Sequence, residues 1–425
     1  MNTIAYNKIP SVETTPVSNM LFYGLLLFFF FEYVRPGMYF PPLEAARLNT
    51  LIPVAVFCFT LLSAGGRSNN EFLNAGNTKW LIFFLCFFPI QIFTADVTLY
   101  VYESFKAVIG YFLIYFVIIK QVHNIKRIKS VFIILVFVHI LMVVLNPNVI
   151  LAPEGRHYMG GTFLGDGNDF AWSVCIILPF SLFLAQTSSS RALKSFYFII
   201  FCLLFLVIIG TQSRGGSIAF GTIILYLILK SENKIKALAG IGILVMLVTA
   251  FAPQVYFDRM KTIRDYETEE SAQGRIMAWK SAYRMAKDHP LVGVGAGHFS
   301  VKYGVEYRPP GVGRTELPWS AVHSVYFRTL GEFGFTGFFF ILGIILFNFI
   351  RNENQLAEIK KTSSNLSNMQ RKLLIALQSS LIGFAVGGFF LSGLFYPHMF
   401  VLAALLESTY YMIRNSQIIG KESHE

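Results

Sequence analysis

Two arginines and a histidine stand where apolar segments meet polar ones, and these side-chain types can hold an anion or move a proton. Arg214 lies in the segment 211–216, TQSRGG, between two apolar runs with almost no connecting loop. A guanidinium at such a boundary is costly unless an anion or carbonyl groups satisfy it, and glycines let backbone approach a ligand closely. Two interpretations stay open: an anion site, or an arginine that extends toward water at a tight turn.

Arg275 and His323 offer complementary chemistry further along the chain. Arg275 begins the helical pattern Gly274–His289, where a guanidinium and a helix N-terminus both favour a phosphate. His323 precedes an apolar run, and an imidazole can take a proton from an attacking hydroxyl near neutral pH. Taken singly, an arginine such as Arg275 is more often a solvated charge, and a histidine such as His323 is more often a hydrogen-bonded interface residue.

Other polar motifs have simpler explanations. Asp166 and Asp169 could hold a divalent metal, but Asp166 and Asn168 stand where a helix cap is expected, and capping is favoured. The glycine-rich segment 289–297, HPLVGVGAG, follows no predicted strand, so it predicts a chain reversal rather than a phosphate loop. The i, i+4 pair Arg328 and Glu332 is expected to be an intrahelical ion pair with a structural role.

The composition shows which environment must position these residues. The chain has 425 residues, of which 54% are hydrophobic and only 14% charged. Soluble proteins carry about 25% charged residues, so this chain has too little polar surface to cover a water-soluble globule. It is therefore predicted to be an all-α, polytopic membrane protein. The four cysteines lie inside apolar runs and are expected to be buried, with no metal-ligand spacing.

Apolar runs of about 20 residues, the length needed to cross a bilayer, predict the membrane spans. The sequence contains twelve such runs, which are taken to be one integral membrane domain over residues 1–425. The runs are 18–34, 48–65, 79–95, 100–119, 130–146, 170–186, 195–212, 214–230, 236–252, 324–350, 372–392 and 395–413.

Lysine and arginine collect in alternate loops, which predicts the orientation. With a cytoplasmic N-terminus, the cytoplasmic segments carry nineteen Lys and Arg, and the short opposite loops carry four: Arg35, Arg47, Arg156 and Arg214. Because positive charge stays on the cytoplasmic side, both termini are predicted to be cytoplasmic. The same bias accounts for the net charge of +11 without nucleic-acid binding.

One connection is far longer than the others. Residues 253–322, between the ninth and tenth runs, are polar and lie on the predicted periplasmic side. Connections this long are usually either functional or disordered. Within them, Ile276, Trp279 and Tyr283 share one helical stripe and basic residues another, which predicts a helix lying on the membrane surface.

Taken together, the order of these motifs resembles the O-antigen ligase family, which includes O-antigen polymerases and protein O-oligosaccharyltransferases. The resemblance covers roughly 161–337, through SRGG at 213–216, GR at 274–275, HPLVGVG at 289–295, HSVY at 323–326 and GEFG at 331–334. The segments 32–36, EYVRP, and 166–170, DGNDF, further resemble a branch of O-glycosylation ligases found beside exosortase systems. The Ser at 324, where many relatives have Asn, is a departure.

The resemblance implies a glycosyltransferase of the bacterial inner membrane that needs no cofactor, metal or nucleotide. It would move a glycan from undecaprenyl pyrophosphate to a periplasmic acceptor hydroxyl on lipid A core, a protein or another glycan. Arg214 and Arg275 would hold the pyrophosphate and His323 would activate the acceptor. The residues expected to support this site are Ser213, Gly215, Asn168 and Tyr326. Direct displacement would place the base opposite the leaving group and invert the anomeric carbon.

Two alternatives remain at this point. The same family includes polymerases that join repeat units. A twelve-span secondary transporter is the rival from another class, and it should show related halves and charged residues at mid-membrane. The runs here are nearly free of charge at their centres, which disfavours transport. The sugars, the acceptor and the oligomeric state do not follow from the sequence.

Overall fold

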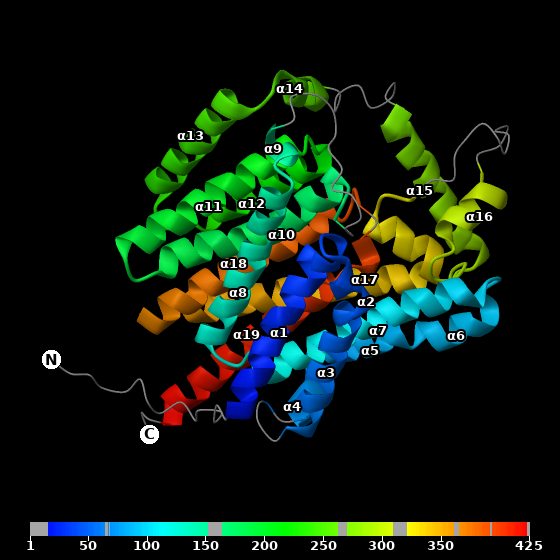
Figure 1. The fold of residues 1–425 in the computed structure, drawn as a ribbon, viewed down its shortest axis with the longest axis horizontal. Coiled ribbons are helices and arrows are strands. Elements are labelled where there is room, and N and C mark those ends of the chain that lie inside the picture. Colours follow the sequence, from blue (N-terminus) through cyan, green and yellow to red (C-terminus); the bar gives the residue numbers. More distant parts are fainter. Residues whose placement is uncertain are drawn as a thin grey trace.

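The computed structural model is an assembly of helices, and the described residues contain no strand (Figure 1). The structure describes residues 16–63, 67, 69–151, 164–261, 270–308, 321–360, 365–391 and 393–422. The helices of the first half are α1 Pro16–Val34, η1 Pro36–Met38, α2 Pro41–Ala45, α3 Leu48–Leu62, α4 Asn69–Asn74, α5 Gly76–Leu85, α6 Phe87–Thr94, α7 Thr98–Gln121, α8 Ile125–Leu145, α9 Asn148–Leu151, α10 Gly167–Thr187 and α11 Arg191–Gly210. Those of the second half are α12 Arg214–Lys230, α13 Lys234–Phe251, α14 Gln254–Lys261, α15 Glu270–Asp288, α16 Phe299–Val305, α17 Val325–Lys360, α18 Asn365–Gly387, η2 Gly393–Phe395 and α19 His398–Glu422.

Each of the twelve predicted runs falls on a helix, but fewer qualify as membrane spans by length and composition. Within the described residues, eight helical stretches do: α1, α5 with α6, α7, α8, α10, α11, α13 and α17. Of the others, α3 has 15 residues and α12 has 17. The helices α18 and α19 are long enough but contain polar residues such as Gln378 and Glu407. A polytopic membrane protein is thus confirmed, and the count of twelve spans stays a prediction.

Local sequence explains where several helices begin. The side chains of Asn124, Ser190 and Asn233 each accept a hydrogen bond from a backbone N–H in the first turn of the following helix. Such caps satisfy donors that a helix N-terminus leaves unpaired. All three lie in the Lys- and Arg-rich loops, so polar loop residues both end the spans and start the next ones.

The helix α10 lies at the centre of the bundle. It packs against α8, α11, α12 and α18, and its largest side chains, Phe170, Trp172 and Phe180, are buried. By contrast, α13 lies at the edge in Figure 1, where Leu244 is its buried residue. An apolar helix with little buried surface suits a position facing lipid.

The cysteines also differ in burial. Cys175 on α10 is buried as expected, but Cys58 and Cys86 are exposed, contrary to expectation.

Hydrogen bonds between helix ends agree with alternating spans. At one end of the bundle, Arg127 at the start of α8 bonds Ser18 at the start of α1, at 3.1 Å. Near another of the Lys- and Arg-rich loops, Arg371 on α18 donates to the carbonyl of Lys230 at the end of α12, at 2.7 Å. We call this Lys- and Arg-rich end the inner end and the other the outer end. Its assignment to the cytoplasm stays a prediction, and residues 1–15, Arg156 and Lys361 lie outside the described residues.

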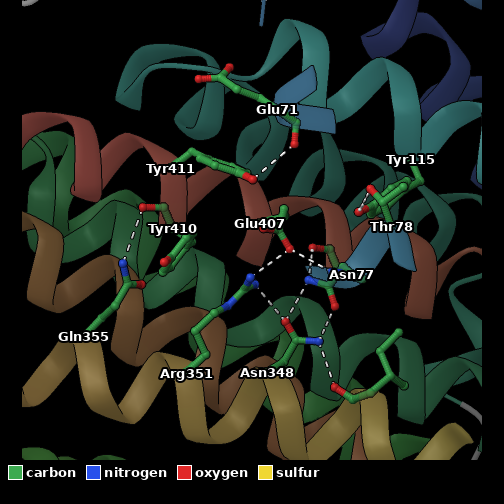
Figure 2. A network of polar contacts seen from close by, with 12 residues as sticks. Glu71, Asn77, Thr78, Tyr115, Asn348, Arg351, Gln355, Glu407, Tyr410 and Tyr411 are labelled. Atoms are coloured by element: carbon green, nitrogen blue, oxygen red, sulfur yellow. Dashed lines mark hydrogen bonds and ion pairs between the residues drawn. The ribbon is translucent and has the colours of Figure 1, made fainter. Parts of the chain in front are cut away.

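A buried polar network joins α5, α17 and α19 toward the inner end (Figure 2). The Glu407 carboxylate, 1% exposed, pairs with Arg351 at 2.8 Å and accepts the backbone N–H of Asn77 at 3.1 Å. The amides of Asn77 and Asn348 donate to each other at 2.9 and 2.7 Å. The run 395–413 contains the charged residue Glu407, and the network explains how that carboxylate is accommodated there.

The long outer connection contains three helices, α14, α15 and α16, which agrees with the prediction of helices within 253–322. Its residues 262–269 and 309–320 lie outside the described residues. The predicted stripe on α15 is wrong in one respect: Tyr283 is 53% exposed, and the buried face is formed by Ala278, Ala282 and Met285. The two alanines are small and allow α15 to pack closely on α17, so the helix lies on the protein rather than presenting that stripe to lipid.

The glycine-rich segment 289–297 forms the predicted chain reversal and packs against a break in α17. Gly334 interrupts α17 with φ +69°, and the N–H of the next residue, Phe335, bonds the carbonyl of Pro290 at 2.8 Å. A Cβ on Gly334 would lie 2.5 Å from that carbonyl oxygen, so glycine is required for this close approach. The motifs 289–295 and 331–334 therefore pack against each other.

Candidate functional site

The corner between α11 and α12 carries Arg214 as the first residue of α12. Ser213 caps this helix by accepting the N–H of Gly216 at 3.1 Å. Gln212 has left-handed backbone, with φ +53°, which turns the chain within a few residues. A Cβ on Gly215 would lie 2.8 Å from Cβ of Phe390, so glycine allows the helix start to press against that aromatic residue. Arg214 is half-buried here, at the outer end.

His323 lies in a short extended segment just before α17. Its backbone is also left-handed, with φ +47°, a conformation that costs free energy in a residue with a side chain. The neighbours hold it in place: the carbonyl of Val322 accepts the indole N–H of Trp279 at 2.9 Å. On the other side, the N–H of Val325 bonds the carbonyl of Gly388 at 2.7 Å. The imidazole itself is half-buried.

Arg275 lies one helical turn before Trp279 on α15, so both side chains project from the same face of the helix. The Trp279 ring stacks on Phe327 with centroids 4.9 Å apart and meets the edge of Phe389 at 5.0 Å. That face therefore points to the segment that carries His323. Arg275 is half-buried, like Arg214.

The residues Gly388, Phe389 and Phe390 lie after α18 and touch the neighbours of all three predicted site residues. We call them the 388–390 segment. Phe390 contacts the corner of Arg214 at Gly215, Phe389 contacts Trp279 on the Arg275 face, and Gly388 bonds the strained segment of His323. The elements that carry Arg214, Arg275 and His323 therefore meet at one place on the outer end.

The supporting roles expected of Ser213, Gly215, Asn168 and Tyr326 stay predictions, and their local contacts are defined. Asp166 caps α10 by accepting the N–H of Asn168 at 2.9 Å, which confirms the capping prediction. Asn168 is buried in the first turn, and Asp169 accepts the hydroxyl of Tyr396 at 2.6 Å. Tyr326 donates its hydroxyl to the carbonyl of Ala385 at 2.7 Å, a contact that anchors α17 to α18. The first part of the 161–170 motif, 161–163, lies outside the described residues.

Ion pairs around the site secure its scaffold. The predicted pair of Arg328 and Glu332 is confirmed, at 3.3 Å, and the Arg328 guanidinium lies over the ring of Phe395. Lys302 on α16 pairs with Asp96 in the loop before α7, and this hydrogen bond holds the pKa of the Asp96 carboxyl below its usual range. The outer helices are thereby fixed to the spans beneath them.

The sequence interpretation missed the groups that connect the site. The 388–390 segment was assigned to the run 372–392, but α18 ends at Gly387 and the aromatic pair follows in a turn. The signal was the dipeptide Gly387-Gly388, which commonly ends a helix. Gln212 was noted only as a neighbour of Arg214, although its backbone and its burial are unusual.

Comparison with protein families identifies the region that carries these residues. Residues 199–342, about a third of the chain, match the O-antigen ligase family. The matched region runs from α11 to the first half of α17, and it contains Arg214, Arg275 and His323. A search of curated proteins found no match. The resemblance drawn from the motifs is thereby confirmed for residues 199–342, which are similar to the O-antigen ligase family.

Proposed function

We propose that this membrane protein transfers a glycan from undecaprenyl diphosphate to an acceptor hydroxyl at the periplasmic face of the bacterial inner membrane. The family match supports glycosyl transfer by a membrane enzyme of the O-antigen ligase and polymerase superfamily. The observation that carries the proposal further is the meeting of three elements at the 388–390 segment. A lipid donor requires a site at the bilayer boundary, and these elements lie at the outer end of the bundle.

The chemistry assigned to the two arginines is charge stabilisation. As the bond from the anomeric carbon to the phosphate oxygen breaks, negative charge gathers on the departing diphosphate. Guanidinium groups can donate paired hydrogen bonds to phosphate oxygens, and charge that is positioned in advance lowers the barrier most effectively. Arg214 and Arg275 would supply this stabilisation without a cation or a cofactor.

The role assigned to His323 is that of a general base. The imidazole would take the proton from the acceptor hydroxyl while its oxygen forms the new bond to the anomeric carbon. The leaving group is undecaprenyl diphosphate, and a single displacement of this kind inverts the anomeric configuration. The left-handed backbone at His323 supports this role, because strained conformations cluster at active sites.

Alanine substitution tests the assignment. Arg214→Ala, Arg275→Ala and His323→Ala should each lower glycan transfer by about 100-fold or more, because each removes a group that acts on developing charge or on the proton. Transfer would be measured with purified protein and a lipid-linked oligosaccharide, with unfolding temperature as the check on folding. Lys280→Ala on α15, which removes an exposed cation from the same helix, is the matched control. Wild-type transfer in all three site variants would overturn the proposal.

Two further measurements refine the proposed activity. Transfer should persist in a chelator, and a strict metal requirement would instead direct attention to Asp166 and Asp169. In a deletion strain, complete loss of capped chains from the lipid A core would indicate a ligase. Caps of a single repeat unit would indicate a polymerase. Mass spectrometry of the missing glycoconjugates would identify the acceptor.

A further inference from the structure

Gln91 and Gln212 are two of the six glutamines that are buried in the described part of the chain, and their side-chain amides differ in hydrogen bonding. The amide of Gln91 on α6 is fully buried, and both its nitrogen and its oxygen make hydrogen bonds. Its nitrogen donates to the carbonyls of Val292 and Glu332, both at 2.7 Å, and its oxygen accepts the N–H of Ala296 at 3.0 Å. Gln91 thus fastens the glycine-rich reversal to a membrane helix.

Gln212 has the same burial without these partners. It is 2% exposed, and neither its amide oxygen nor its amide nitrogen has a hydrogen bond. Its backbone is left-handed as well, at φ +53°. A buried amide that has lost its hydrogen bonds to water and makes none within the protein destabilises the folded state. The left-handed backbone of a glutamine adds to this cost. Folding stability therefore gives no reason to keep a glutamine at this position.

The position of Gln212 suggests what the amide is for. It directly precedes Ser213, the cap of α12, and Arg214, so it shares the helix N-terminus at the proposed diphosphate site. The helix N-terminus favours an anionic ligand, and a buried polar group without a partner close by calls for a functional explanation. Gln212 and the helix start are two independent features of one corner.

The chemistry of the amide narrows the class of ligand. A guanidinium only donates hydrogen bonds, which suits phosphate oxygens, whereas a glutamine amide both donates and accepts. The group next to the diphosphate in a lipid-linked glycan is its first sugar, whose hydroxyl or acetamido groups also donate and accept. Resting on the proposed function, we propose that Gln212 binds the first sugar of the donor and selects for it, beside the diphosphate held by Arg214.

The burial of the Gln212 amide means that side chains must move before a ligand can bind it. Both polar atoms of the Gln212 amide are closed off from solvent in the structure described here. A sugar can therefore reach the amide only after the side chains covering it move. Binding of a sugar-bearing donor should stabilise the protein against unfolding more than binding of the lipid diphosphate alone, because the first ligand satisfies the amide and the second does not.

The experiment compares two ligands on the full-length protein in detergent. The probes are undecaprenyl diphosphate and undecaprenyl diphosphate carrying a single N-acetylglucosamine, each titrated against the wild type and three variants. Gln212→Met keeps the length of the side chain and removes its hydrogen bonding. Gln91→Met makes the same change where the amide is fully bonded, and Arg214→Ala removes the proposed diphosphate contact. Affinity and unfolding temperature are measured for each.

The expected result separates the two glutamines. The wild type should bind the sugar-bearing probe about tenfold more tightly than the bare diphosphate, the worth of one or two hydrogen bonds. Gln212→Met should abolish this preference and raise the unfolding temperature, while Gln91→Met should lower the unfolding temperature. Arg214→Ala should weaken the binding of both probes.

Other results would overturn the inference or the proposed function separately. A wild-type preference retained in Gln212→Met, or an unfolding temperature lowered by that change, would overturn the assignment of Gln212. Tight binding of both probes without preference would also overturn it and leave the diphosphate site intact. A wild type that binds neither probe would overturn the proposed function together with the sugar assignment.

Discussion

The inner network around Glu407 and the outer corner at Gln212 both bury polar side chains, but only one of them completes its hydrogen bonds. In the network, the carboxylate of Glu407 is matched by Arg351 and by the N–H of Asn77, and two asparagine amides bond each other (Figure 2). At the corner, the amide of Gln212 bonds nothing and its backbone is strained. The network joins its helices through completed hydrogen bonds, whereas the corner leaves both polar atoms of the Gln212 amide without a partner.

This difference indicates that the hydrogen bonding of a buried polar group, rather than its burial alone, helps to identify a functional site in an apolar protein. Buried polar groups are expensive in both regions, so their presence alone does not mark a site. A satisfied network joins helices, whereas an unsatisfied or strained group becomes a candidate for ligand binding when it also lies beside other candidate site residues. Four non-glycine residues of the described chain have left-handed backbone. Two of them, Gln212 and His323, neighbour the 388–390 segment or the helix start that touches it. The other two, Arg35 and Arg47, precede η1 and α3.

The largest expected effect comes from breaking the inner network. Glu407→Leu leaves the Arg351 guanidinium without its carboxylate in a buried setting, which costs about 3–5 kcal/mol. Thermal unfolding in detergent should show a large loss of stability. Glycan transfer per folded molecule should stay near wild type, because the network is distant from the 388–390 segment along α17. Adding Arg351→Leu should restore much of the stability, and failure of the double variant to recover would contradict the account.

A smaller effect is expected from changing the shape of one cation at the outer site. Arg275→Lys keeps the charge but loses the fork that can bond two phosphate oxygens. Transfer should fall by about 10- to 100-fold, the equivalent of one or two charge-assisted hydrogen bonds. Stability should not change, unlike the result at Glu407. Wild-type rates in this variant would argue against a paired grip on the diphosphate.

Trp279→Phe weakens the connection between α15 and the His323 segment. The phenyl ring can still stack on Phe327, but the hydrogen bond from the indole to the carbonyl of Val322 is lost. Stability should fall by about 1 kcal/mol. Transfer should fall further than that loss accounts for, because His323 is positioned through this contact. A proportional fall in both quantities would make Trp279 a purely structural residue.

The last effect concerns pH at the inner end. Burial, followed by the positive charges of Arg127 and Arg67, lowers the pKa of His123 in the loop after α7 to about 4. The unfolded chain has a pKa near 6.5 there and binds more protons between these values. Stability is therefore full above about pH 6.5 and falls as the pH drops toward 4. Unfolding temperatures at about pH 7.5 and 5 should differ less in His123→Gln than in the wild type; equal differences would contradict this.

Much of the architecture could be predicted because it depends on properties that a sequence displays directly. Runs of apolar residues coincide with the helices, and the charge pattern agrees with the gathering of helix ends around Arg127 and Arg371. Local rules also held for the cap at Asp166 and the pair of Arg328 with Glu332, because each joins residues a few positions apart. The buried face of α15 was predicted wrongly because side-chain size, not hydrophobicity, decides how closely two helices pack.

The sequence by itself determined that the chain is a membrane protein, which family its 199–342 region resembles and which residues could do chemistry, because composition and motif order are local information. Only the tertiary structure decided that α18 ends at Gly387 so that Phe389 and Phe390 join the Arg214, Arg275 and His323 elements. It also decided that Gln91 is bonded and Gln212 is not. The physical reason is that a hydrogen bond depends on distances between groups that may be 200 positions apart in the chain, as Gln91 and Val292 are 201 apart.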